Sequence, residues 1–278
     1  MRLLMVGDIT GRPGRDWAIE LAPALRQRLH LQAVVMNAEN AAAGLGITPA
    51  IADSLLAPDV ADVLTLGNHA FARREICEYL KYEPRILRPA NYPPDTPGRG
   101  MGIYSLPCGT LAVISLLGRT FMEAVDCPFR TGDELLNKAR EITNVVLCDF
   151  HAEATSEKKA FGWHADGRVG AVLGTHTHVQ TADEQILPNG TAFMSDVGMT
   201  GPKWSVIGVQ SDLVVQRFIT GMPVRYETAM APAELCGAVV DIEQNTGRAA
   251  SIWRLRVTNA AGAPRVMLGP RAQPEDME

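Results

Sequence analysis

Short apolar runs alternate with amphipathic stretches over the first two thirds of the chain. The unbroken apolar runs predict strands, at residues 2–9, 33–40, 62–69, 144–151 and 170–178. The amphipathic stretches predict helices, at residues 16–29, 47–56 and 73–82. Apolar strands separated by helices in this way predict sheets that helices cover.

Hairpin signals interrupt this alternation. Two hairpins are predicted, at residues 102–118 and 184–198. Further along, an amphipathic helix is predicted at 211–220 and a strand pair that turns at residues 245–247. These additional units favour a mixed α/β architecture with two sheets over a single parallel sheet.

No repeat, low-complexity tract or Ser/Gly/Pro-rich linker divides the chain. A length of 278 residues suits one large α/β domain or two ordinary ones. Because no linker is visible, we predict a single domain over residues 1–259. The remainder, residues 260–278, is predicted to be an exposed or loosely packed C-terminal tail.

The composition is that of an ordinary soluble globular protein, with 46% hydrophobic and 21% charged residues. A net charge of −5 provides no broad basic surface for long polyanions, although a small phosphate ester in a metal-lined pocket stays compatible with it. The start, MRLLMVGDIT, has no cleavage-site pattern, and nowhere do about 18 apolar residues run together. We therefore expect no membrane association and a cytoplasmic location.

The five cysteines are odd in number and form no CxxC pair. This pattern disfavours both a disulfide framework and a thiolate zinc site. Any metal in this protein must therefore be held by nitrogen and oxygen ligands.

The five predicted strands end in residues that can bind a metal. They are Asp8, then Glu39 and Asn40, then Asn68 and His69, then His151, and finally His176 and His178. Each cluster alone has an ordinary alternative: Asp8 as a helix cap, Asn68 as a turn residue, or His151 as a buried histidine with its hydrogen bonds satisfied. Ligands of open α/β sheets bind beyond the carboxyl ends of the strands, so the five clusters together favour one metal site.

His176 and His178 lie two positions apart in GTHTHVQT. In a strand they would face one side, about 6 to 7 Å apart, and in a loop both could still bend toward a shared site. The full set offers more ligands than one ion takes, which suits two metals about 3.5 to 4 Å apart bridged by one carboxylate. Glu39 is the obvious bridge.

The order of these residues resembles that of the calcineurin-like metallophosphoesterases, which have a four-layer αββα sandwich. The chain departs from the usual pattern at Thr10, where that superfamily has a histidine, at Glu39 in place of an aspartate, and at the inserted Thr175. These departures match one subgroup. Segments such as NAENAAAGLG, GNHAF, FHAEATSEKKAFGW and SDVGMTGP resemble the bacterial YmdB-type phosphodiesterases, up to about residue 257.

The resemblance implies hydrolysis of cyclic nucleotides, 2′,3′-cyclic ones above all, at a dinuclear iron or manganese centre. It implies a first metal held by Asp8, Glu39, Asn40 and His178. It implies a second metal held by Glu39, Asn68, His151 and His176. The ligand types themselves leave Mg²⁺ and Zn²⁺ as alternatives.

The expected reaction is in-line attack of a metal-bridging hydroxide on phosphorus, with His69 protonating the leaving sugar oxygen. The alternative for His69 is a residue that only orients Asn68. Arg12 and Arg15 are candidates for phosphate binding at the start of the next helix, or are solvated arginines.

Two other functions stay open from the sequence. The same ligand set suits a metal-dependent phosphomonoesterase or phosphoprotein phosphatase. A protein of another class, metal-stabilised and regulatory or RNA-associated with incidental catalysis, is disfavoured by the acidic net charge. A homo-oligomer with closed symmetry is the default expectation for a soluble enzyme.

Overall fold

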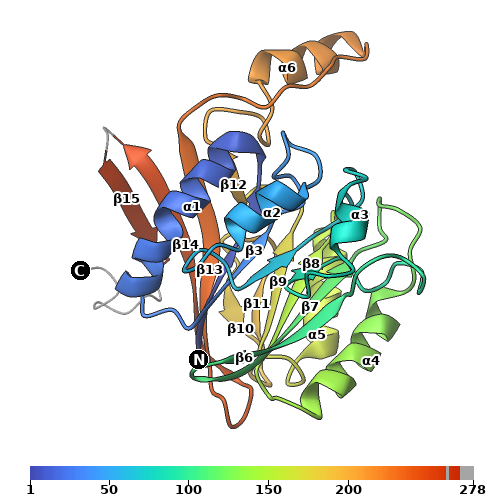
Figure 1. The fold of residues 1–278 in the computed structure, drawn as a ribbon, viewed down its shortest axis with the longest axis vertical. Coiled ribbons are helices and arrows are strands. Elements are labelled where there is room, and N and C mark those ends of the chain that lie inside the picture. Colours follow the sequence, from blue (N-terminus) through green and yellow to red (C-terminus); the bar gives the residue numbers. More distant parts are fainter. Residues whose placement is uncertain (261–262, 270–278) are drawn as a thin grey trace.

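Two mixed sheets lie face to face in the computed structural model, which describes residues 1–260 and 263–269 (Figure 1). The larger is a nine-stranded sheet with the order β15-β14-β13-β1-β3-β4-β5, with β12 and β2 attached at its side. Its strands are β1 (Arg2–Val6), β2 (Asp8–Ile9), β3 (Ala33–Asn37), β4 (Val63–Thr65), β5 (Ile86–Leu87), β12 (Met199–Pro202), β13 (Ala233–Ile242), β14 (Ala249–Ala260) and β15 (Ala263–Leu268).

The second sheet is six-stranded, with the order β10-β11-β9-β8-β7-β6. Its strands are β6 (Met101–Leu106), β7 (Gly109–Leu117), β8 (Val146–His151), β9 (Ala171–Thr175), β10 (Gln185–Ile186) and β11 (Ala192–Met194). Strands β7, β8, β9 and β11 run parallel, while β6 and β10 are antiparallel to their neighbours. Both predicted hairpins, β6–β7 and β10–β11, are therefore confirmed.

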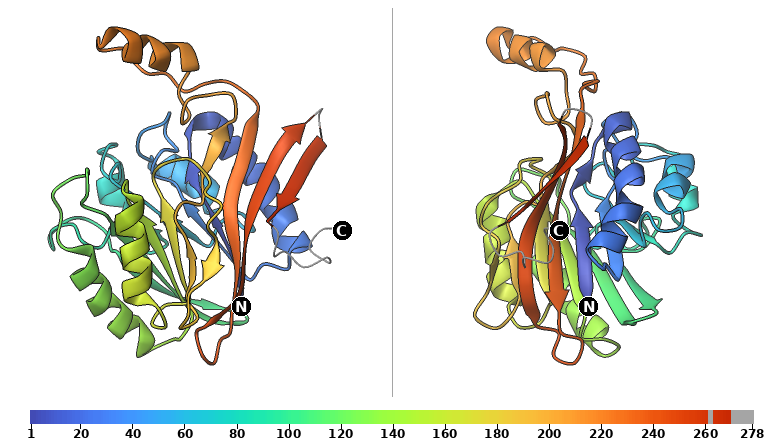
Figure 2. Two further views of the ribbon diagram at one scale, coloured as in Figure 1. Left: turned by 180° about the vertical axis from the view of Figure 1, so that it is seen from behind. Right: turned by 90° about the vertical axis from the view of Figure 1, so that its left-hand side faces the viewer.

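Helices cover the outer face of each sheet. On the nine-stranded sheet lie α1 (Gly11–Arg28), α2 (Pro49–Leu55) and α3 (Ile76–Tyr79), and on the six-stranded sheet lie α4 (Pro128–Arg140) and α5 (Thr155–Ala165). The edge-on view in Figure 2 shows the two sheets between these helices. The predicted four-layer αββα sandwich is confirmed.

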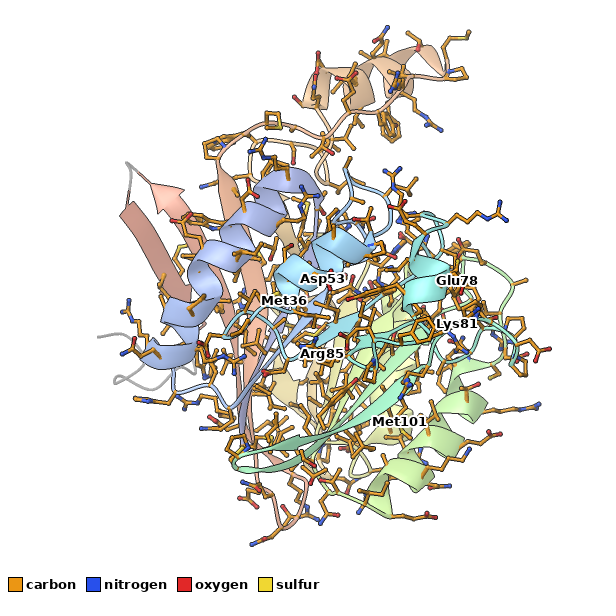
Figure 3. All side chains as sticks on the ribbon, in the orientation of Figure 1. Met36, Asp53, Glu78, Lys81, Arg85 and Met101 are labelled. Carbon is orange, nitrogen blue, oxygen red and sulfur yellow. The ribbon has the colours of Figure 1, made fainter. Side chains whose placement is uncertain are left out.

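Alternation along the strands explains the layers, because successive strand residues point to opposite faces. In β1, Leu4 and Val6 pack against the helices, whereas Leu3 and Met5 pack between the sheets. In β8, Cys148 and Phe150 pack against the outer helices. Figure 3 marks one such outward residue, Met36 of β3, which is buried in the core with α1 and α2.

The inner face of β8 changes character toward its end. Leu147 packs in the apolar core between the sheets, but Asp149 and His151, which follow at the same spacing, are polar and fully buried. Strands β1, β3 and β4 are parallel, and so are β8 and β9, so their carboxyl ends bring polar residues from both sheets to one edge of the sandwich.

Several predicted boundaries are corrected. Helix α1 begins at Gly11, five residues before the predicted start, because Pro13 falls in the first helical turn, where its missing N–H costs nothing. Strand β9 ends at Thr175, since His176 (φ 105°) and His178 (φ 65°) have left-handed backbone conformations that no strand tolerates. Of the two arrangements considered for this histidine pair, the structure therefore has the loop.

The predicted tail is partly incorporated into a sheet. Residues 263–268 form strand β15, which pairs antiparallel with β14, so this part of the segment is not loosely packed. The predicted strand pair turning at residues 245–247 is β13 and β14. The rest of the predicted tail, residues 261–262 and 270–278, lies outside the described residues.

One element stands away from the layers. Helix α6 (Ser211–Thr220), predicted at the same residues, projects from one end of the sandwich in Figures 1 and 2. Only Val214 of this helix is buried, while Phe218 and Ile219 are 83% and 79% exposed. We call the segment from 203 to 230, which leaves the sheet after β12 and returns to β13, the arm.

The described part of the chain contains no helix that is both long and apolar enough to cross a membrane. All five cysteines are free, as their number and spacing predict.

Candidate active site

Glu39 lies at the centre of the polar cluster that the strand ends create. It follows β3, is 0% exposed, and directs Oε1 toward residues from both sheets. Oε1 lies 3.2 Å from His151 Nε2 and accepts a 3.1 Å hydrogen bond from Asn40 Nδ2. Oε2 accepts the backbone N–H of His69 at 3.0 Å. One carboxylate therefore contacts the two halves of the predicted ligand set.

One half of that set gathers around His151. His151 Nε2 lies 3.0 Å from His176 Nδ1 and 3.1 Å from Asn68 Oδ1. The ligand atoms of Glu39, His151 and His176 all lie within 4.8 Å of one another, which is close enough to hold one ion. These residues and Asn68 are the ones that, by the resemblance, would hold the second metal.

The hydrogen bonds of His151 fix which of its nitrogens carries a proton. Thr175 donates its hydroxyl proton to Asp149 Oδ1 at 2.6 Å, because a carboxylate only accepts. The hydroxyl oxygen must then accept from His151 Nδ1, at 2.8 Å. The lone pair of the neutral ring is left on Nε2, which faces His176 and Glu39.

The ring of His176 is fixed in the same way. Its Nε2 lies 3.2 Å from the Glu153 carboxylate, so Nε2 carries the proton and Nδ1 presents its lone pair to His151 Nε2. In the protonated form that its pKa of about 9 favours, His151 donates its second ring proton to His176 Nδ1 at 3.0 Å; when both rings are neutral, the two lone pairs face each other and a cation fits between them. The position therefore fits a metal ion.

The other half of the set is Asn40 and His178. Asn40 Nδ2 lies 3.1 Å from His178 Nε2, and His178 Nδ1 donates to the carbonyl of Ile207 at 3.0 Å. The carbonyl can only accept, so Nδ1 carries the proton, and Nε2 accepts from the Asn40 amide on the side that faces the site.

Asp8, the first residue of β2, completes this side. It is fully buried, its Oδ2 accepts the backbone N–H of His176 at 3.1 Å, and its Oδ1 has no hydrogen-bond partner among the described residues. A buried carboxylate oxygen without a donor is costly unless a cation is bound. Asp8 Oδ1 is thus a second observation that fits a metal at this position.

Gly67 makes room for the cluster. A Cβ atom at this position would lie 2.3 Å from both Glu39 Oε2 and His151 Nε2. Only glycine lets the chain between β4 and Asn68 pass this close to the ligand atoms.

The charges in the cluster shift several pKa values. Burial raises the pKa of Asp8 to about 6. Burial would also raise the pKa of Glu39, but the charges of His151 and His69 hold it well below its usual value. Burial disfavours the charged His151 ring, yet Glu39 and Asp8 outweigh it and raise the pKa to about 9. Burial and the nearby His151 lower the pKa of His176 to about 3, so its lone pair is available at neutral pH.

His69 lies beside the cluster. Its Nδ1 is 2.8 Å from Asn40 Oδ1 and 3.3 Å from Glu39 Oε1, and its side chain is 33% exposed. Burial favours the neutral ring, but the hydrogen bond and charge of Glu39 outweigh it and raise the pKa of His69. The raised pKa favours the protonated ring, which is the form that a proton donor needs.

A cavity of about 1020 Å³ opens directly on this cluster. Glu39, Asn40, His69, His176 and His178 line one end of it. Neither Arg12 nor Arg15 reaches it: Arg12 pairs with Asp16 on the exposed first turn of α1, and Arg15 donates to the Ala41 carbonyl at 2.7 Å. The arginines that line the cavity are Arg73 and Arg225.

Comparison with known proteins matches residues 4–255 to the family described as YmdB-like protein. The chain belongs to the YmdB-like family. It is 45% identical over 259 residues to the 2′,3′-cyclic-nucleotide 2′-phosphodiesterase of Bacillus subtilis, covering 93% of this chain and 98% of that protein. This match confirms the predicted resemblance and the prediction that the chain is an enzyme.

Solved structures agree with this assignment. A novel phosphatase from Mycoplasma pneumoniae is 29% identical with a TM-score of 0.87, over 93% of each chain. The 5′-nucleotidase of Candida albicans has a TM-score of 0.54 at 10% identity, covering 93% of this chain and 51% of that one, and shows the shared fold alone.

Some residues that support the site were missed by the sequence reasoning. Asp149 accepts hydrogen bonds from Thr175, Asn37 and Thr65, at 2.6, 2.9 and 2.5 Å, and is fully buried between the sheets. The sequence VLCDFH contains a signal for this residue, because an aspartate interrupts an apolar strand there. A buried carboxylate needs hydrogen-bond donors around it, so such an aspartate indicates a polar network.

The loop that carries His176 and His178 has its own support. Asp196 Oδ2 accepts from the backbone N–H and the hydroxyl of Thr177, at 3.0 and 2.7 Å, and from Lys158 Nζ at 2.8 Å. Lys158 of α5 and Asp196 are 2% and 1% exposed. This buried ion pair holds the left-handed turn between the two histidines.

Proposed function

We propose that the chain is a metal-dependent phosphodiesterase that hydrolyses small cyclic nucleotides, with 2′,3′-cyclic nucleoside monophosphates preferred. The observation that carries the proposal is the contact of one buried carboxylate, Glu39, with both halves of the predicted ligand set. The name of the Bacillus subtilis relative supports the substrate class.

We propose two divalent ions, iron or manganese first. Asp8, Glu39, Asn40 and His178 would hold one ion, and Glu39, Asn68, His151 and His176 the other. The buried Asp8 Oδ1, which accepts no hydrogen bond from a described residue, and the 3.0 Å contact between His151 Nε2 and His176 Nδ1 support this assignment. When bound, such ions neutralise phosphoryl oxygens and supply a hydroxide nucleophile near neutral pH.

The protein residues then have separate tasks. Glu153 holds the ring of His176, and the Thr175–Asp149 pair holds the ring of His151, so that His176 Nδ1 and His151 Nε2 are directed at each other. As the oxygen of water bonds to phosphorus, the bond from phosphorus to the ribose O2′ breaks. His69 donates its proton to that oxygen, which leaves a nucleoside 3′-monophosphate.

The test combines elemental analysis of the purified protein with a substrate panel of 2′,3′-cyclic, 3′,5′-cyclic and monoester nucleotides. We expect close to two transition-metal ions per chain and the highest kcat/KM on the 2′,3′-cyclic diester. A preference for the monoester would favour the second candidate, a phosphomonoesterase, which the phosphatase from Mycoplasma pneumoniae suggests by its name. Absence of turnover with full metal content would refute both.

His69→Gln tests the proton donor. We expect kcat to fall by roughly 100-fold, the usual contribution of a general acid, while metal content stays unchanged. Loss of metal together with activity would show that His69 only orients the ligands. His164→Gln, on the exposed pair with Asp133, is the matched control.

We further propose that the enzyme works in the cytoplasm, as a homo-oligomer, on small substrates. The net charge of −5 supports the last point, because long polyanions need clustered Lys and Arg.

A further inference from the structure

The cavity extends well beyond the cluster that would act on phosphate. It is also lined by the two ends of the arm, residues 207–209 and residues 225–228, and by Leu45. A volume of about 1020 Å³ is at the upper end of the usual range for pockets that hold whole cofactors or drug-sized ligands. A cyclic phosphate and its ribose would leave much of this space unfilled.

The two ends of the arm are joined into one wall. Gln210 N donates to the Glu227 carbonyl at 3.0 Å, and Ala229 N donates to the Gly208 carbonyl at 2.9 Å. The wall is fixed to the catalytic end as well, since the carbonyl of Ile207 holds His178 Nδ1 at 3.0 Å. The arm is therefore placed at a set distance from the phosphate end of the cavity.

Chemically the wall differs from the cluster. Ile207, Val209 and Leu45 offer apolar surface and Tyr226 offers an aromatic ring, beside the charged Arg225 and Glu227. The guanidinium of Arg217, from α6, lies 5.3 Å from the centroid of that ring. Because Arg217 does not line the cavity, it supports the ring without filling the space next to it.

Resting on the proposed function, we propose that this wall is the nucleobase site, in which the base of a cyclic nucleotide stacks on Tyr226 between Ile207 and Leu45. Stacking on an aromatic side chain tolerates every base, since each has a π face. The protein therefore selects nucleotides over other diesters without a strong choice among the four bases.

The test compares two substrates with the same reacting group. One is adenosine 2′,3′-cyclic phosphate, and the other is the 2′,3′-cyclic phosphate of methyl riboside, which lacks a base. For Tyr226→Ala we expect KM for the adenosine substrate to rise roughly 10-fold, with kcat within about twofold. KM for the base-free substrate is expected to stay the same.

Controls separate stacking from damage to the fold. Tyr226→Phe keeps the ring and is expected to behave as the wild type. Tyr82→Ala removes a tyrosine that is 80% exposed elsewhere on the surface, and Phe218→Ala removes an aromatic ring from the arm that does not line the cavity. Calorimetry gives a readout without turnover: Tyr226→Ala should weaken adenosine 3′-monophosphate binding roughly 10-fold and leave inorganic phosphate binding unchanged.

The outcomes are distinguishable. If the wild type hydrolyses neither cyclic phosphate, the proposed function fails and the base site fails with it. If it hydrolyses both, and Tyr226→Ala alters both KM values equally or neither, the base site alone is wrong. An unequal effect on the two substrates, matched by the binding data, supports the base site.

Discussion

Each histidine of the cluster has one ring nitrogen tied to a fixed acceptor and the other directed at further members of the ligand set. Thr175 holds His151, Glu153 holds His176, and the Ile207 carbonyl holds His178. These partners set both the ring orientation and the position of the lone pair, which is what a metal requires of an imidazole. Thr175 thus serves His151 and not the histidine that follows it in sequence.

The two histidines of the loop are expected to serve different ions. His178→Ala should deplete the ion next to Asp8 and Asn40, and His176→Ala the ion next to Asn68 and His151, so each variant should retain about one ion. Elemental analysis of the single variants and of the double variant, which should retain none, measures this. His164→Ala, outside the cluster, is expected to keep the wild-type content. If either single substitution removes both ions, the division between the two histidines is wrong.

At the scale of elements, the polar residues at the strand ends could be predicted from the sequence. The residues that hold them in place could not. A run of apolar residues that stops at Asp8, at Glu39 or at His151 is visible in sequence, and parallel strands bring such ends together. The contact between Lys158 and Asp196 could not be predicted, because the two residues are 38 positions apart. No local pattern relates a helix residue to a loop that follows another strand. The limits of β9 were hidden for a similar reason: the left-handed turn is imposed by Asp196, which binds Thr177 from outside.

The arm shows the same division between local and tertiary information. Its helix, residues 211–220, follows from an amphipathic pattern and was predicted at the right place. That its two ends would form the wall of the cavity depends on contacts such as the packing of Gly208 beside Thr10. Such contacts join segments that are distant in sequence, so no local pattern indicates them.

The ion pair under the histidine loop allows a prediction about this element. Asp196→Ala would leave the Lys158 ammonium buried without a counter-charge, so we expect a loss of about 3–5 kcal/mol in the free energy of unfolding. The double variant Asp196→Ala with Lys158→Met removes the unpaired charge and should regain much of that loss. Urea denaturation measures both.

A neighbouring lysine provides the control for that experiment. Lys159 is 47% exposed and pairs with Asp183 at 3.6 Å, so Lys159→Met should cost no more than about 1 kcal/mol. Equal losses for Lys159→Met and Asp196→Ala would mean that burial of the Lys158 pair is not what stabilises the loop.

At the scale of the whole molecule, the cluster lies where the two sheets meet. Asp8 begins β2, and Glu39, Asn40 and Asn68 follow strands of the nine-stranded sheet. His151 ends β8 of the six-stranded sheet, and His176 and His178 follow its strand β9. An apolar core holds the sheets together over most of their facing surfaces. At the carboxyl ends of the strands, polar side chains replace the apolar core. A metal ion bound there by residues of both sheets would hold the sheets together.

Metal binding is therefore expected to stabilise the whole sandwich. An ion that binds only the native state adds about 2.7 kcal/mol at a free concentration 100 times its Kd. We expect chelation to lower the thermal midpoint by several degrees and Mn²⁺ to restore it, as measured by calorimetry. The double variant His176→Ala with His178→Ala, which keeps the other ligands, should show no shift with Mn²⁺. A wild-type midpoint that does not respond to chelation or Mn²⁺ would contradict the idea that the ions join the two sheets.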